Sequence, residues 1–164
     1  MNLELAQALI RQLGPALGGT TSTYTMDDNG EVQLVMDDSL PILIRFADPV
    51  LIIAAIVATD VEPSEPDLFV TLMDYQYMGL RTNGYTLSWN GGTSALQLSA
   101  HMRGDPDVTV LVDELSTLIE TALEVREELA TIIAYQRTVR ESAGVDLDDA
   151  PETAVLQQPA MLRG

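Results

Sequence analysis

The chain contains no cysteine and no lysine, and its one histidine is His101. Nucleophilic catalysis needs an activatable serine, cysteine, threonine or lysine beside a base, which is most often histidine. No serine lies in a G-x-S-x-G sequence, and zinc sites usually take several cysteine and histidine ligands. These absences argue against an enzyme and against a zinc site. The lack of disulfides suits a reducing compartment.

Positive charge is also scarce. The 164 residues include 25 acidic side chains against 8 basic ones, all arginine, for a net charge of -17. Such a chain repels nucleic acid and anionic lipid, because contacts to phosphate need lysine or arginine. The charge favours solubility and, alternatively, a basic protein partner. We therefore expect no nucleic-acid partner.

No membrane insertion is expected either. The N-terminal residues 1–14 lack the basic segment and continuous apolar run of a signal peptide. The longest apolar run, residues 49–58, is far shorter than the roughly 18 residues of a membrane-spanning helix. The sequence therefore predicts a protein that stays in the cytoplasm.

The first half of the chain predicts a helix followed by antiparallel strands. Apolar residues recur at helical spacing over residues 2–17, and β-forming residues favour a short strand at 22–26. Asn29-Gly30 is a strong hairpin signal that requires positive φ at both residues. Strands are expected at 32–36, 40–46 and 50–59, the last buried on both faces because it is wholly apolar.

The second half predicts a helix, a hairpin and a long helix. The helix should span about 65–82 and end at Asn83-Gly84, and the hairpin should pair 85–89 with 95–102. A helix opened by Asp105-Pro106-Asp107 should run to about residue 143. The expected fold is α+β, an antiparallel twisted sheet with three helices in α-β-β-β-α-β-β-α order. Residues 1–143 would form the domain and 144–164 a flexible acidic tail.

Candidate chemical sites have simpler structural interpretations. The segment 27–31 resembles part of a calcium loop, but alignment on Gly30 places Thr25 and Met36 where carboxylates are required. Asp37 and Asp38 are adjacent, so their side chains point apart and fit a turn. His101 lies near a strand end, where a surface or hydrogen-bonding role is commoner than a catalytic one. We therefore predict no catalytic residue, no metal and no cofactor.

The apolar residues, in contrast, exceed what one helix face needs. Phe69, Val70, Met73 and Tyr77 supplement the Leu68 side of the middle helix, and the last helix has apolar residues off its main stripe. A second apolar face either meets a partner or is wrapped by the twisted sheet. The surplus favours a protein that binds another protein.

The order of these elements resembles the class I type III secretion chaperones, the Tir-chaperone-like proteins that accompany bacterial effectors to the secretion apparatus. The resemblance covers roughly residues 3–135. It is a pattern of element order and soft motifs. The matching segments are Leu13-Gly14, Leu17-Gly18, residues 24–30, 32–34 and 36–40, Ala54-Ala55, and residues 84–89, 95–98 and 110–115. The charged segment 63–66 and the tail depart from the family pattern.

The resemblance implies a non-catalytic homodimer in the bacterial cytoplasm that binds the N-terminal segment of one or several effectors in extended form. A family member that serves many effectors would also contact the secretion ATPase. By the same resemblance, the effector would dock on the first helix and hairpin and the dimer would form through the middle helix. The implied effector-binding residues are Ile10, Leu13, Leu17, Tyr24, Met26 and Leu34. The implied dimer residues are Leu68, Phe69, Leu72, Met73 and Tyr75.

Two other functions remain open from the sequence. An acidic adaptor could bind a folded basic partner through its charge, and its binding would weaken steeply with salt, unlike burial of an apolar segment. A hydrolase using Asp37, Asp38 or His101 would need an activity that disappears when these residues are substituted.

Overall fold

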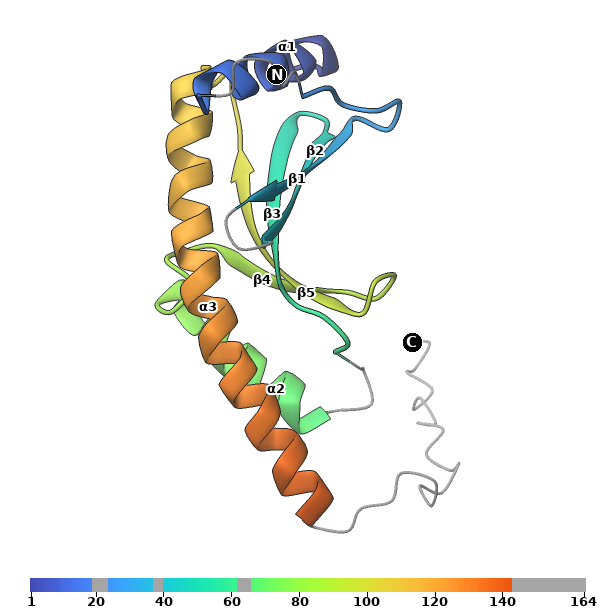
Figure 1. The fold of residues 1–164 in the computed structure, drawn as a ribbon, viewed down its shortest axis with the longest axis vertical. Helices are drawn as coiled ribbons and strands as arrows, with labels where there is room; N and C mark the ends of the chain where they lie inside the picture. Colours follow the sequence, from blue (N-terminus) through green and yellow to red (C-terminus); the bar gives the residue numbers. More distant parts are fainter. Residues whose placement is uncertain (19–23, 37–39, 62–65, 143–164) are drawn as a thin grey trace, which may run out of the picture.

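The computed structural model describes residues 1–18, 24–36, 40–61 and 66–142. These residues form three α-helices, one short 3-10 helix and five strands in the order that the sequence predicts (Figure 1). The elements in chain order are α1 (Leu3–Ala16), β1 (Glu31–Met36), β2 (Leu40–Ala47), β3 (Val50–Ala58), α2 (Pro66–Gln76), η1 (Tyr77–Gly79), β4 (Thr86–Asn90), β5 (Ala95–Met102) and α3 (Val108–Ser142). The expected α+β fold is therefore confirmed, while the expected tail at 144–164 lies outside the described residues.

The strands form one antiparallel sheet in the order β1-β2-β3-β5-β4. The apolar strand β3 is central, as expected, with β2 on one side and β5 on the other. Alternation sets the faces of β1, where Val32 and Leu34 are buried while Gln33 and Val35 are exposed. The outermost strands, β1 and β4, each have one edge without a neighbouring strand in the described structure.

The helix α3 runs along the length of the molecule and packs on β3 and β5 (Figure 1). Asp107 caps its start by accepting hydrogen bonds from the backbone N–H groups of Thr109 and Val110, at 2.9 and 3.0 Å. Its apolar stripe, including Leu111, Leu115 and Leu118, is buried in the core. Helix α1 packs near the N-terminal end of α3 and α2 lies along its C-terminal half.

The expected strand at 22–26 is wrong where the structure describes it, because Tyr24 to Met26 have no strand pairing. Positive φ occurs at Gly30 (+74°) but not at Asn29, so the turn is not the two-residue hairpin that Asn-Gly favours. The physical reason is Asp27, whose Oδ1 accepts hydrogen bonds from the backbone N–H groups of Asn29 and Glu31, each at 2.9 Å. This side chain reverses the chain in place of a strand pair.

The middle helix is also shorter than the expected 65–82. It ends at Gln76, and the chain continues as the 3-10 turn η1. Met78 has a φ of +56° and Gly79 of +66°, which no α-helix accommodates. Gly79 allows the close return of the chain, because a Cβ there would lie 3.0 Å from Gly84 Cα. The turn expected at 37–39 lies outside the described residues.

Candidate protein-binding surfaces

The six residues expected to bind an effector segment lie in or against one part of the hydrophobic core, between α1 and the start of the sheet. Half are in the core and half are partly exposed over it. The core members are Ile10, Leu13 and Leu34, and the partly exposed members are Leu17, Tyr24 and Met26. The second group is therefore accessible to a partner, while the first supports it from beneath.

The free edge of β1 begins beside Asp27, the residue that follows Met26. Phe46 N–H donates to Gly30 O at 2.9 Å, so the backbone N–H and C=O groups of the even-numbered residues of β1 point toward β2. Odd-numbered residues turn their backbone groups the other way, and Asp27 N–H donates to Glu31 O at 2.8 Å on that side. Beyond Glu31, the backbone groups of Gln33 and Val35 follow on the open edge. We call Leu17, Tyr24, Met26 and this edge at Gln33 and Val35 the α1–β1 surface.

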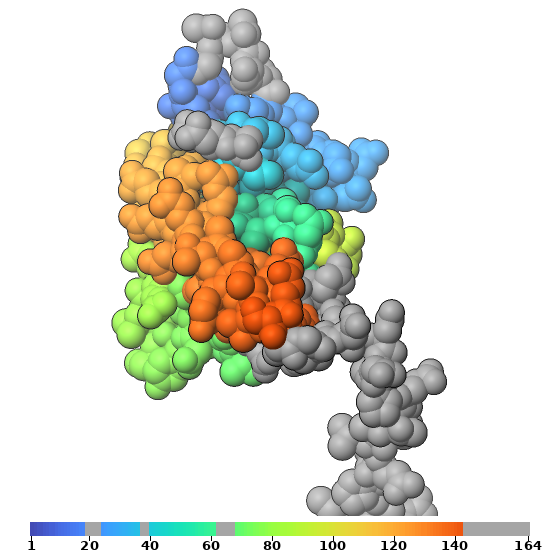
Figure 2. Space-filling model, turned by 60° about the horizontal axis from the view of Figure 1, so that its bottom comes forward, coloured from blue at the N-terminus to red at the C-terminus, as the bar shows by residue number. Residues whose placement is uncertain are grey.

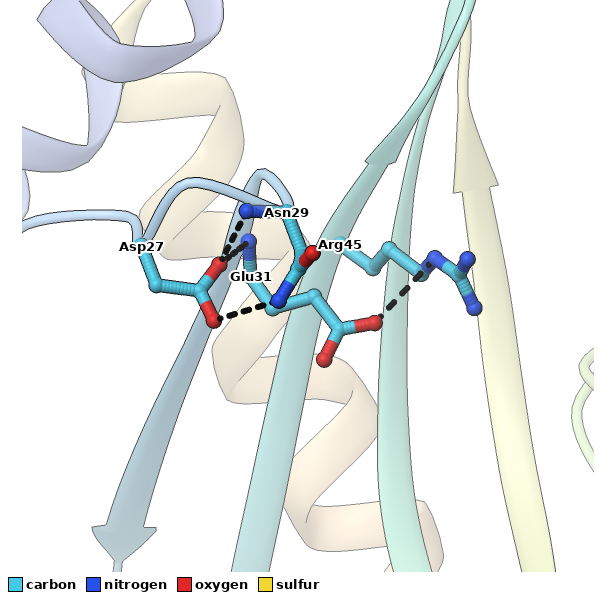
Figure 3. A network of polar contacts seen from close by, with 4 residues as sticks. All are labelled: Asp27, Asn29, Glu31 and Arg45. Carbon is cyan, nitrogen blue, oxygen red and sulfur yellow. Dashed lines mark hydrogen bonds and ion pairs between the residues drawn. The ribbon is translucent and has the colours of Figure 1, made fainter.

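Asp27 ends the open edge of β1 by occupying the strand position beside Glu31. Its Oδ2 accepts a further hydrogen bond from Asn29 Nδ2 at 3.3 Å, and Glu31 Oε1 pairs with Arg45 Nε at 3.2 Å (Figure 3). The hydrogen bond from the Glu31 backbone, joined by those from Asn29, holds the pKa of Asp27 below its ordinary value. The segment that resembled a calcium loop thus uses this carboxylate to hold its own backbone.

The five residues expected at a dimer interface divide across α2. Leu68, Leu72 and Tyr75 are buried against the domain, Phe69 is half-buried, and Met73 is 74% exposed. Three further apolar side chains, Val70, Tyr77 and Met78, are also exposed here. The sequence singled out Val70 and Tyr77 as surplus, but the exposure of Met78 follows from the turn η1, which has no sequence signal. We call Phe69, Val70, Met73, Tyr77 and the neighbouring Trp89 the α2 surface.

Trp89 on β4 is the member of this surface that sequence reasoning missed. Its ring meets Phe69 edge-on, with 5.7 Å between centroids, and its indole N–H donates to Val61 O at 3.0 Å. A largely apolar cavity of about 290 Å³ lies between α2 and β4. Its lining residues are Phe69, Leu72, Met73, Gln76, Leu87, Ser88, Trp89 and Leu96. The α2 surface therefore has both protruding apolar side chains and a hollow that could receive one.

Two tyrosines fix this end of the molecule to α3. Tyr75 Oη donates to Glu128 Oε2 at 2.9 Å, and burial followed by this hydrogen bond raises the pKa of Tyr75 to about 12. Burial, then the charge of Glu114, raises the pKa of Tyr85 to about 12. Gln136 Nε2 also donates to Thr71 Oγ1 at 3.4 Å. Figure 2 shows the resulting contact, with the C-terminal part of α3 (orange) beside the segment that contains α2 (green).

The alternative chemical sites gain no partners in the part of the chain that the structure describes. His101 is exposed on β5, opposite Ile52 of β3. Asp37 and Asp38 lie outside the described residues. Among helices in the described ranges, none combines the length and the apolar character needed to cross a membrane.

Solved structures with the same fold include chains from the ExsC–ExsE complex and from two chaperone complexes. A chain of the ExsC–ExsE complex matches with a TM-score of 0.64 and 15% identity, covering 77% of this chain and 95% of that one. A chain of the HopA1–SchA chaperone–effector complex gives 0.59 and 15%, covering 76% and 95%. The Yersinia pestis type III secretion chaperone SycH, in complex with a stable fragment of YscM2, gives 0.52 and 13%, covering 73% and 98%.

Sequence comparison gives the same answer. No curated protein sequence matches this chain. The sequence profile of the Tir chaperone protein (CesT) family, however, matches residues 8–127, which run from within α1 to within α3 and so include both surfaces described above. The chain therefore belongs to the Tir chaperone protein (CesT) family, the class I type III secretion chaperones that its sequence resembles.

Proposed function

We propose that this protein is a non-catalytic type III secretion chaperone that binds the N-terminal region of one or more effector proteins. It keeps that region extended and competent for secretion, and delivers it to the secretion apparatus. The observation that carries the proposal is the family match over residues 8–127 of a chain with the complete chaperone fold. The solved complexes of ExsC with ExsE and of HopA1 with SchA support it by their fold.

The α1–β1 surface is the proposed effector site. An extended segment can add to the open edge of β1 by hydrogen bonding to the backbones of Gln33 and Val35, while its apolar side chains cover Leu17, Tyr24 and Met26. Ile10, Leu13 and Leu34 contribute by fixing the floor beneath these residues. Backbone pairing would supply affinity for any extended chain, and the apolar contacts would supply selectivity.

The α2 surface is the proposed homodimer interface. Met73 and Val70 are 74% and 67% exposed, and Phe69 and Trp89 border the cavity between α2 and β4. Apolar exposure of this kind on a small acidic domain favours association with a second copy. Leu68, Leu72 and Tyr75 hold α2 in place from the buried side. The dimer would act in the bacterial cytoplasm without a cofactor, and contact with the secretion ATPase would follow for a chaperone of many effectors.

Co-purification from the native bacterium, followed by limited proteolysis, tests the effector proposal. We expect a protected N-terminal fragment of a secreted protein to remain with the chaperone. A Tyr24→Asp/Met26→Asp variant should lose this fragment, because two charges would face its apolar side chains. Val110→Asp, at an exposed apolar position on α3, is the matched control and should retain it. Equal recovery with both variants would contradict the proposed site.

An acidic adaptor that binds a folded basic partner is the second candidate, favoured by the net charge of -17 and by the exposed acidic residues of α3. Those residues are Asp113, Glu120, Glu124, Glu127, Glu128 and Glu141. Salt separates the two functions. Adaptor binding should fall steeply between low and high salt, whereas burial of an apolar segment should persist.

A further inference from the structure

The two edge strands of the sheet differ in what occupies their free backbone groups. Among the described residues, strand β4 pairs only with β5, so one of its edges faces away from the sheet. Such an edge normally accepts a further strand, in this protein or in an aggregate. At the start of β4, however, the structure places a side chain where the next strand would run.

That side chain is Gln76, the last residue of α2. Its Oε1 accepts a hydrogen bond from the backbone N–H of Leu87, and its Nε2 donates to Tyr85 O at 3.2 Å. One amide group thus supplies an acceptor to Leu87, the second residue of β4, and a donor to Tyr85, the residue just before β4. The backbone of a neighbouring strand would bind two alternate residues in the same way. The side chain is half-buried and lines the wall of the cavity between α2 and β4.

A second donor completes the closure. Thr82 is fully buried, and its Oγ1 donates to the same Tyr85 O at 2.7 Å. A carbonyl oxygen has two lone pairs, so both acceptor positions of Tyr85 are already used. A strand arriving here would have to displace two side-chain donors and leave Thr82 Oγ1 buried without its acceptor, which is unfavourable.

We propose that Gln76 closes the start of the β4 edge, at Leu87, so that an extended segment pairing over more than one residue can extend this sheet only at β1. On β1, Asp27 binds the backbone N–H and C=O groups of Glu31 in a similar way, and it leaves those of Gln33 and Val35 open. The partner that fits the open edge of β1 is an extended peptide in which every second residue is apolar. The closure of β4 follows from its own contacts and does not depend on the proposed chaperone function.

The absence of cysteine allows a direct test with a tethered strand. Single cysteines are introduced at Thr93→Cys, in the turn after β4, or at Asp28→Cys, in the turn before β1; both residues are exposed. The probe is a peptide with the sequence of residues 31–36, joined by a disulfide through a glycine spacer. Tethering raises its local concentration to about the millimolar range, so pairing need not rely on free binding. Hydrogen exchange of the peptide amides and of Leu87 N–H is then measured.

With Gln76 present, the peptide at residue 93 should exchange as fast as the free peptide, whereas that at residue 28 should exchange about tenfold more slowly, as expected for one added hydrogen bond. In Gln76→Ala, the peptide should be slowed at both positions, and Leu87 N–H should exchange about tenfold faster without the peptide. Gln12→Ala is the matched control, because Gln12 donates only within α1, to Ala8 O. It should behave as the parent.

A second variant separates closure from loss of folding. Gln76→Glu keeps an acceptor for Leu87 N–H but has no donor for Tyr85 O, so Leu87 should stay slow and the β4 edge closed. Protection of the peptide at residue 93 while Gln76 is present would overturn the proposal. So would a peptide that stays unprotected there in Gln76→Ala, or equal behaviour of the two edges in the parent protein.

Discussion

Tyr75 on α2 and Glu128 on α3 form a hydrogen bond with 2.9 Å between Oη and Oε2, and Glu128 is the first residue beyond the family match. The bond joins α2 and α3 at the end of the molecule that contains the cavity between α2 and β4. The remainder of α3, to Ser142, contacts α2 again where Gln136 Nε2 donates to Thr71 Oγ1 at 3.4 Å, and it buries Leu129 and Ile133 in the core. The extended helix therefore holds α2 against the domain while the other side of α2 stays exposed.

Loss of this hydrogen bond should weaken the fold without changing it. We expect Tyr75→Phe to lower the free energy of unfolding by about 1 kcal/mol, because a hydrogen bond to a charged but exposed partner contributes near the lower end of the usual range. Urea denaturation measures the difference. Tyr135→Phe, on the exposed side of α3, is the control and should leave the midpoint unchanged. A Tyr75→Phe midpoint equal to that of the parent would show that the bond contributes nothing.

High pH should destabilise the protein through its two buried tyrosines. The pKa values of Tyr75 and Tyr85 are about 12 in the fold against 10 for the unfolded chain. The folded state thus favours the neutral phenol, and this stabilisation is complete below pH 10 and lost as the pH rises to about 12. Unfolding free energies measured across this range should fall more steeply for the parent than for Tyr75→Phe/Tyr85→Phe. Parallel curves would contradict the raised pKa values.

Acid should act on the Asp27 turn in the opposite sense. Its pKa is lowered from 3.8, so the carboxylate stabilises the fold above that pH and the contribution is lost as the pH falls through the lower folded value. Asp27→Ala should remove this dependence and speed hydrogen exchange at the Glu31 amide, its bonded partner. Asp28→Ala, next to it and exposed, should do neither. NMR follows both quantities, and an unchanged Glu31 amide in Asp27→Ala would argue against the turn.

Charge on the α2 surface should abolish the proposed dimer. Met73 is exposed in the single chain, so Met73→Asp should leave the fold intact while placing an unpaired carboxylate at an apolar interface. Sedimentation equilibrium should then find a monomer where the parent is a dimer. Val110→Asp is again the control and should remain dimeric. A dimeric Met73→Asp protein would locate the interface elsewhere.

Truncation in the core should be far more damaging. Leu98 on β5 and Leu115 on α3 are almost completely buried, and either Leu→Ala change should cost about 2–5 kcal/mol. Leu80→Ala provides the comparison, because Leu80 is 79% exposed and should change stability by less than about 0.5 kcal/mol. Chemical denaturation distinguishes these outcomes, and a small effect at Leu98 and Leu115 would place them outside the core.

Periodicity predicted the elements whose burial depends on local pattern. The continuous apolar run of β3 correctly indicated a central strand, and the apolar stripe from Leu111 correctly indicated the long helix. Failures occurred where a side chain replaces a backbone partner. Asp27 reverses the chain two residues before the Asn-Gly pair that seemed to govern the turn. Turn propensities describe the Asn-Gly dipeptide alone. They do not include a carboxylate that lies earlier in the chain and binds two backbone amides of the turn.

The surfaces were only partly foreseeable for a related reason. Leu13 and Leu17 have equivalent spacing in the sequence, yet Leu13 is buried and Leu17 is half-buried, since α1 ends at Ala16. Trp89 joins Phe69 only because the chain folds α2 back over β4. The contacts of Gln76 link α2 to β4 across a reversal at η1. No local pattern specifies which helix end will meet which strand edge.

The length of α3 sets a minimum size for any ligand that contacts both ends of the molecule. Val108 borders α1 and Gln136 contacts α2, and the helix rises about 40 Å between them at about 1.5 Å per residue. A fully extended chain covers this distance in about 12 residues. Shorter peptides can therefore occupy one end only, and a longer segment bound at both ends gains avidity from the rigid separation.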